Sequence, residues 1–171
     1  MEFGLIAPVL ILFMMGVIEL AMIMSVQNVM ESATFTASRL GKTGFKATGK
    51  TQEETILASL KGVGSTLLDP TKITVTSLSY KDYDSVGKPE PFTDTNKDGV
   101  RNATEAYTDT NGNGKYDTDQ GKTGFGNAGD IVVYTMNYPW RPFTLVLGKL
   151  VTTNGVLPLS ARAVVRNEPY S

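Results

Sequence analysis

The chain has 171 residues, of which 41% are hydrophobic and 19% are charged, and its formal net charge is −1. It contains no His and no Cys, which excludes catalytic relays built on either residue, the usual zinc and haem ligands, and disulfide bonds. A net charge near zero, without a basic patch, argues against nucleic acid as the main partner. The length suits one domain with an additional segment.

The N-terminal part of the chain is almost free of charge. The first basic residue is Arg39, and Glu19 is the only ionisable side chain in residues 3–24. This stretch would form about 33 Å of helix, enough to cross a ~30 Å hydrocarbon layer. Beyond it, apolar residues continue at helical spacing with polar residues on the opposite face. We therefore predict one helix over residues 3–40, apolar all round in its first half and amphipathic in its second.

This apolar segment differs from a secretory signal peptide, because it starts at residue 3, has no basic residue ahead of it and is longer. A single-pass membrane anchor is one interpretation. Two acidic residues favour a further role, since a carboxylate inside a membrane helix is costly and usually functional. In a bundle of such helices Glu2 would pair with a neighbouring N-terminal amine. Glu19 would either form hydrogen bonds within a helix bundle or take part in assembly.

Motifs at the two ends of the chain resemble one family. Residues 2–10 (EFGLIAPVL) and 16–20 (GVIEL) are similar to the start of TadE-like pilins, small type IV pilin-related proteins of tight-adherence systems. Residues 138–143 (YPWRPF) and 161–170 (ARAVVRNEPY) are similar to the C-terminal "YP…RP" turn and "RNEP" ending of that family. The resemblance covers residues 1–40 and about 130–170 and leaves the middle of the chain uncovered.

The resemblance implies a subunit made as a membrane-held precursor, cut by a prepilin peptidase, and packed through its N-terminal helix into a filament by pilus assembly machinery. It also implies that Glu2 takes the place of the pilin glutamate that neutralises a neighbour's amine during assembly. We interpret the sequence as the mature chain, or as one given without its leader.

The remainder of the chain has the pattern of a small α+β head. Residues 41–50 form a glycine-containing flexible linker. Thr51 and Glu54 form a capping box that begins a predicted helix over residues 52–68. Three strands need an apolar partner, which the amphipathic half of the first helix supplies. We predict a pilin-like long helix packed on a small antiparallel sheet. The strands are expected over residues 72–80, 130–138 and 157–166.

The predicted organisation is an N-terminal helix over residues 1–40 and a globular head over residues 41–171, with an insertion at about 82–129. Residues 139–151 lie between the last two predicted strands and contain Trp140, the only tryptophan. One interpretation is a loop with a short helix that caps the sheet. The other is a contact between neighbouring subunits, because an aromatic residue beside an arginine suits an interface.

The insertion contains an internal repeat. Residues 90–99 realign with residues 105–114, and each copy contains the pattern Asp-x-Asn-x-Asp/Asn-Gly. This pattern is typical of EF-hand calcium loops, in which positions 1, 3, 5, 7, 9 and 12 supply oxygen ligands and a glycine at position 6 allows a sharp turn. No flanking helices are indicated, so we expect bare calcium loops. The alternative is an acidic, glycine-rich loop that holds no metal.

The expected Ca²⁺ ligands follow from these loop positions. Glu105 would be bidentate, whereas Gln120 cannot chelate through two oxygens, so the second site is expected to be weaker unless Asp119 substitutes for it. The first loop offers Asp94, Asn96, Asp98, the carbonyl of Val100, and Glu105, and the second offers Asp109, Asn111, Asn113, the carbonyl of Lys115, Asp117 and Gln120.

Together these patterns favour a structural protein over an enzyme: a pilin or minor pilin of a Tad-like cell-surface filament, held in the cytoplasmic membrane before assembly, with exposed loops stabilised by calcium. The alternative is a membrane-anchored, calcium-dependent adhesin or binding module that does not polymerise. A hydrolase that uses two carboxylates among Asp82, Asp84 and Glu90 is disfavoured, because nothing in the sequence places two of them in a cleft.

Overall fold

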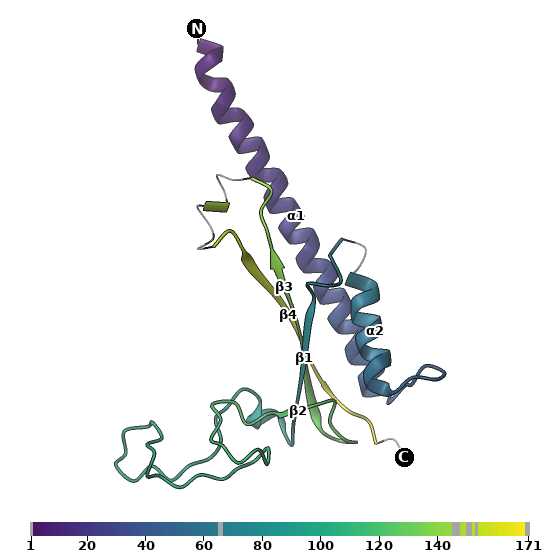
Figure 1. Ribbon diagram of the computed structural model, residues 1–171, viewed down its shortest axis with the longest axis vertical. Coiled ribbons are helices and arrows are strands. Elements are labelled where there is room, and N and C mark those ends of the chain that lie inside the picture. Colours follow the sequence, from purple (N-terminus) through teal and green to yellow (C-terminus); the bar gives the residue numbers. More distant parts are fainter. Residues whose placement is uncertain (1, 65–66, 145–147, 150–151, 153, 170–171) are drawn as a thin grey trace.

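The computed structural model describes residues 2–64, 67–144, 148–149, 152 and 154–169. Figure 1 shows the helix α1 as a long rod whose N-terminal half extends beyond the head, while the sheet and α2 lie along its C-terminal half. This arrangement confirms the predicted α+β fold. The elements are α1 (Glu2–Lys42), α2 (Gln52–Gly64), β1 (Thr74–Tyr80), the 3₁₀ helix η1 (Tyr83–Ser85), β2 (Lys122–Thr123), β3 (Ile131–Trp140) and β4 (Leu157–Arg166).

The two halves of α1 have different surroundings, as the sequence predicted. In the first half, large apolar side chains such as Phe3 and Phe13 are 80% and 68% exposed. In the second half, Val26, Met30 and Ala33 are fully buried. These three recur every three or four residues, which places them on one face of the helix. Only the second half of α1 therefore belongs to the core of the head.

The sheet is antiparallel, with strand order β2-β1-β3-β4. Its central strand, β3, is buried on both faces. Val132, Tyr134 and Met136 belong to the main core with α1, whereas Ile131 and Val133 pack with residues of β1 in a smaller cluster. Burial on both faces explains why β3 has an almost continuous apolar sequence rather than an alternating one.

The second helix begins where its capping box predicted. The Thr51 hydroxyl accepts a hydrogen bond from the Glu54 backbone N–H (3.1 Å), and the Glu54 carboxylate accepts one from the Thr51 backbone N–H (2.8 Å). Ile56 of α2 is fully buried in the core. The helix ends at Gly64 rather than at the predicted residue 68. Glycines are poor helix formers, and α2 contains two of them in its last turn.

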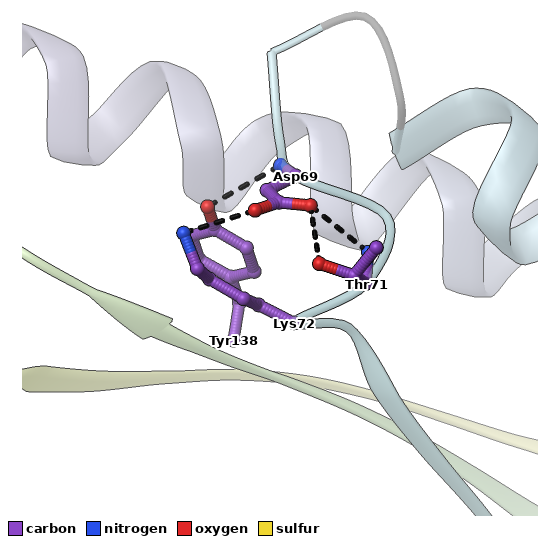
Figure 2. Close-up of polar contacts among 4 residues, drawn as sticks. All are labelled: Asp69, Thr71, Lys72 and Tyr138. Atoms are coloured by element: carbon purple, nitrogen blue, oxygen red, sulfur yellow. Dashed lines mark hydrogen bonds and ion pairs between the residues drawn. The ribbon is translucent and has the colours of Figure 1, made fainter.

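Asp69 fixes the turn from α2 into β1 (Figure 2). Its carboxylate accepts hydrogen bonds from the hydroxyl (2.6 Å) and the backbone N–H (3.1 Å) of Thr71, and it forms an ion pair with Lys72 (2.9 Å). The Thr71 hydroxyl, followed by Lys72, lowers the pKa of Asp69 to about 2. The Asp69 backbone N–H also donates to the Tyr138 hydroxyl, at 3.3 Å. This turn is therefore tied directly to the central strand.

The strands confirm the three predicted segments with shifted ends. β1 begins at Thr74 rather than at residue 72, and β3 continues to Trp140 rather than ending at residue 138. β3 can include Pro139 because its pairing with β1 stops at Asn137, beyond which it pairs with β4 alone. The two residues of β2 were not predicted, because so short a strand carries no recognisable alternation.

Candidate functional site

The insertion leaves the sheet after β1 and returns to it at β2, and it forms the loops that project from the C-terminal end of the head in Figure 1. Its base is closed by backbone hydrogen bonds from Glu90 to Asp117 (3.0 Å) and from Gln120 to Lys88 (2.9 Å). The hydroxyl of Tyr80, on β1, donates to the Asp119 carboxylate at 2.8 Å. Burial, together with this hydrogen bond to Asp119, raises the pKa of Tyr80 to about 12.

The first loop (residues 94–105) and the second loop (residues 109–120) have matching backbone conformations. At position 4, Lys97 has a φ of 63° and Gly112 a φ of 77°, and at position 6, Gly99 has a φ of 76° and Gly114 a φ of 78°. Lys97 is the only non-glycine residue with positive φ in the described part of the chain. A positive φ is costly for a lysine, so the surrounding loop must hold it in place.

The aspartate at position 1 organises each turn. The carboxylate of Asp94 accepts hydrogen bonds from the backbone N–H groups of Lys97 (2.6 Å) and Gly99 (2.9 Å). In the second loop, Asp109 accepts the corresponding hydrogen bonds from Gly112 (2.7 Å) and Gly114 (2.8 Å). The Gly114 N–H is the main cause of the lowered pKa of Asp109.

In the first loop, the side chains at positions 3, 5 and 9 converge. One carboxylate oxygen of Asp98 accepts hydrogen bonds from the amide groups of Asn96 (2.8 Å) and Asn102 (3.3 Å). The other accepts the Val100 backbone N–H at 2.8 Å. The Val100 N–H, followed by Asn96, lowers the pKa of Asp98.

The same three positions converge in the second loop, although the carboxylate is at position 9 instead of position 5. One oxygen of Asp117 accepts hydrogen bonds from the amide groups of Asn111 (2.8 Å) and Asn113. The structure thus brings together the predicted ligands at positions 3 and 5 of both loops and at position 9 of the second loop. In the first loop, position 9 is Asn102, which the sequence did not indicate as a ligand.

Glu105, at position 12 of the first loop, is buried and spans that loop. One of its oxygens accepts the Thr95 N–H (2.8 Å), and the other accepts the Asn102 N–H (2.8 Å). These donors belong to loop positions 2 and 9. Both carboxylate oxygens therefore face the backbone of the first loop.

Glu90 has the same relation to the second loop, although it precedes that loop in sequence. It is fully buried and accepts the N–H groups of Thr110 (2.7 Å) and Asp117 (3.1 Å), again at positions 2 and 9. The amide of Gln120, by contrast, donates to the carbonyl oxygens of Ser85 and Pro89, outside the loop. The loop pattern of the sequence indicates Gln120 at position 12, whereas in the structure Glu90 makes the contacts with the second loop that Glu105 makes with the first.

Aromatic side chains join the two loops. Phe92 and Tyr107 form an isolated antiparallel bridge. The Arg101 guanidinium lies 4.6 Å from the centre of the Tyr107 ring and 4.8 Å from that of Tyr116. Tyr116 also packs edge-to-face against Phe92 and Tyr107. The two loops therefore form one unit, joined by half-buried aromatic rings.

The donor set of the loops fits calcium better than a transition metal. Among the described residues, no group of three or more His, Cys, Asp or Glu side chains could hold a metal by itself. Each loop combines carboxylates with asparagine amides. The amide oxygens of Asn96, Asn111 and Asn113 each accept a backbone N–H of their own loop, which leaves each oxygen a second lone pair. Calcium accepts carboxylate, amide and backbone carbonyl oxygens together.

The carboxylates considered for a hydrolase have other partners. Asp82 caps η1 by accepting hydrogen bonds from the hydroxyl (2.7 Å) and the backbone N–H (2.8 Å) of Ser85. The Ser85 hydroxyl is the main cause of the lowered pKa of Asp82. Asp84 is exposed, and Glu90 is bonded to the second loop.

A second polar site lies where α1 enters the head. Glu19 is only 4% exposed, and one of its oxygens accepts the Trp140 indole N–H at 3.1 Å. The other oxygen accepts the backbone N–H groups of Phe143 (2.8 Å) and Thr144 (3.3 Å). Glu19 is therefore hydrogen-bonded to its own head, a partner that the sequence did not reveal. Trp140 is buried in the same contact.

Two predictions fall partly outside the described residues. Glu2 begins α1, but its side chain is outside what the structure describes. The short helix expected within residues 139–151 falls largely on residues 145–147 and 150–151, which also lie outside the described ranges.

One described helix is long and apolar enough to cross a membrane: α1, from Ile6 onwards, with only 11% of its most apolar window buried. Residues 1–39 match the family model described as TadE-like protein. This match supports the TadE-like family, a structural kind of protein, and a membrane-associated or pilus-related location. No curated protein and no solved structure matches the chain.

Proposed function

We propose that the chain is a structural subunit, a pilin or minor pilin, of a Tad-like cell-surface filament. The observation that carries this proposal is the exposure of large apolar side chains around the first half of α1, such as Phe3, Val9 and Ile18, which are 80%, 66% and 61% exposed. A helix surface that is apolar all round must be buried in lipid or in protein. The cytoplasmic membrane covers it before assembly, and the helices of neighbouring subunits cover it in the filament.

Glu2 has the pairing role in this proposal, and a prepilin peptidase and the pilus assembly machinery are the other partners. Replacing Glu2 by Gln removes the charge that would neutralise a neighbour's amine in an apolar filament core. We expect Glu2→Gln to abolish incorporation into sheared surface filaments, while the protein still accumulates in the membrane. Glu53→Gln, at an exposed position of α2, is the matched control.

Each outcome has a distinct meaning. Normal assembly of Glu2→Gln would show that the pairing role is wrong. If the unmodified chain stays in the membrane and never enters filaments, polymerisation itself is wrong, and the non-polymerising adhesin takes its place.

We further propose that the paired loops bind Ca²⁺, with Glu90 rather than Gln120 as the position 12 residue of the second loop. The support is the convergence of the same three loop positions in both copies, and the backbone N–H groups that Glu90 and Glu105 accept, which belong to positions 2 and 9 of their loops. Calcium would offset the mutual repulsion of the carboxylates in each loop. It would hold the exposed insertion in one conformation outside the cell.

Calcium titration of the full chain in detergent tests this proposal. A ligand that binds only the folded state stabilises it by RT ln(1 + [L]/Kd). With a Kd of roughly 10⁻⁴ to 10⁻³ M for an extracellular calcium loop, 1 mM Ca²⁺ contributes about 0.4–1.4 kcal/mol for each occupied loop. We expect millimolar Ca²⁺ to raise the melting temperature, and a chelator to increase proteolysis within residues 90–120. If both measurements stay unchanged, the loops are ordinary acidic turns.

Charge-neutral variants of similar shape locate the effect. Asp98→Asn and Asp117→Asn should each weaken the calcium response, whereas Asp84→Asn, at an exposed position outside the loops, should leave it intact. Glu90→Gln should reduce the response more than Gln120→Ala. A larger loss of the calcium response in Gln120→Ala than in Glu90→Gln would show that Gln120 is the position 12 ligand of the second loop.

A further inference from the structure

The residues that follow β3 lie against α1 at the level of Glu19. The segment from Trp140 to Thr144, here called the tip, is held there by the three hydrogen bonds to the Glu19 carboxylate. In Figure 1 this end of β3 is the part of the sheet nearest to the free half of α1. The tip therefore marks where the head begins along the helix.

Apolar side chains surround α1 at the same level. Val17, Ile18 and Leu20, which flank Glu19 in sequence, are 52%, 61% and 58% exposed. Consecutive helical residues point in different directions, so the tip covers one side of the helix while apolar surface covers the others. Lipid or protein that buries these three side chains must therefore also contact the tip.

The exposed side chains of the tip suit a membrane surface. Phe143 is 72% exposed and packs edge-to-face against Trp140, with ring centres 5.5 Å apart. Arg141 is exposed in the tip, and Lys149 is exposed a few residues beyond it. Aromatic rings and long basic side chains are the residues that gather at the boundary between hydrocarbon and headgroups.

The depth of the tip follows from the length of the helix. Glu19 is about 24 Å along the helix from Phe3, and about 8 Å before the end of the apolar run at Met24. With the apolar run filling a ~30 Å hydrocarbon layer, the tip lies about 6 Å inside the outer edge of that layer. From this depth a long basic side chain can extend to the headgroups and reach lipid phosphates.

We propose that the tip is a second membrane contact of the unassembled subunit: Phe143 enters the headgroup–hydrocarbon boundary, Arg141 binds lipid phosphates, and Glu19 positions both. This proposal rests on the membrane-held state of the proposed function. It adds that the subunit contacts the bilayer at two places, through the apolar half of α1 and through the tip of the head.

The only tryptophan of the chain lies in the tip and reports its depth. The full chain is reconstituted in vesicles of phosphatidylcholine and phosphatidylglycerol, with bromine on the lipid chains either near the headgroups or near the bilayer centre. We expect loss of Trp140 emission with the shallow bromines and a clearly smaller loss with the deep ones. Equal emission with and without bromine, in protein that floats with the vesicles, would overturn the proposal.

Two variants test the chemistry of the contact. Arg141→Glu should reduce the shallow quenching in anionic vesicles, while Lys61→Glu, at an exposed position of α2, should not. Glu19→Gln should weaken the dependence of quenching on bromine depth, because the tip loses the carboxylate that positions it. Unchanged quenching in both Arg141→Glu and Glu19→Gln would show that the tip does not bind lipid through these residues. A chain that fails to float with vesicles would refute the membrane-held state as well.

Discussion

Tyr80 connects the sheet to the insertion, because its buried ring lies on β1 and its hydroxyl reaches Asp119. The close approach of the two segments depends on Gly121, where a Cβ would lie only 2.7 Å from the Tyr80 ring and hydroxyl. The phenol must keep its proton to donate to a carboxylate. Its environment accordingly raises its pKa to about 12.

This shift predicts a loss of stability at alkaline pH. The ordinary pKa of tyrosine is about 10, so between pH 10 and 12 the unfolded chain releases a proton that the folded chain retains. The stabilisation is fully present below about pH 10 and is lost as the pH rises through about 12. Urea unfolding midpoints at about pH 9 and about pH 11 should fall more steeply for the unmodified protein than for Tyr80→Phe. Equal slopes would show that Tyr80 contributes nothing to the pH dependence.

Glu90 contacts the second loop although it lies outside that loop in sequence, and a local sequence motif cannot indicate such a contact. The calcium-loop pattern indicates Glu105 at position 12 of the first loop, and Glu105 accepts hydrogen bonds from the backbone of that loop. In the second loop the pattern indicated Gln120, because it counts along the chain. The antiparallel bridge between Phe92 and Tyr107 instead brings Glu90 to the second loop. The repeat itself carried the signal, since it aligns Glu90 with Glu105.

At the scale of elements, the sequence predicted each long helix and strand, because their apolar periodicities are strong. The predicted ends of these elements were wrong where residues from other parts of the fold decide them. α2 stops at Gly64, and β3 continues through Pro139 because no partner on that side needs its missing N–H. The bonding of Glu19 to Trp140, 121 residues away, could not be predicted, because no local pattern encodes so distant a contact.

The packing of α1 on β3 depends on a glycine. A Cβ at Gly41 would overlap the Tyr134 hydroxyl, and Tyr134 is fully buried. We expect Gly41→Ala to lower the free energy of unfolding by about 1–3 kcal/mol, as overpacked cores do. Gly62→Ala is the control, because a Cβ there meets nothing within 4 Å and alanine favours a helix.

Chemical denaturation in detergent measures this effect. Tyr134→Phe in the Gly41→Ala background should recover part of the lost stability, because it removes the hydroxyl that the new methyl group meets. A Gly41→Ala protein as stable as the unmodified chain would mean that α1 moves away from β3 at little cost.

On the scale of the whole molecule, α1 belongs to two environments that meet between Glu19 and Val26. On the N-terminal side of that boundary its side chains are exposed and apolar, and on the C-terminal side one face is fully buried in the head. The head and α1 are therefore not separate units. It uses the second half of α1 as one of its core layers, beside α2 and the sheet (Figure 1).

Two truncations separate these environments. A chain that begins at Ser25 keeps Val26 and all later core residues, so we expect a folded monomer that needs no detergent. A chain that begins at Gly41 loses the helix layer over Tyr134 and Met136, and each buried apolar side chain contributes about 1.5–3 kcal/mol. Because the total stability of such a domain is only about 5–15 kcal/mol, we expect this shorter chain not to fold.

Circular dichroism, thermal unfolding and size-exclusion chromatography distinguish the outcomes. Cooperative unfolding of the shorter chain would show that α1 is dispensable for the core, and aggregation of the longer one would show that apolar surface extends past Met24.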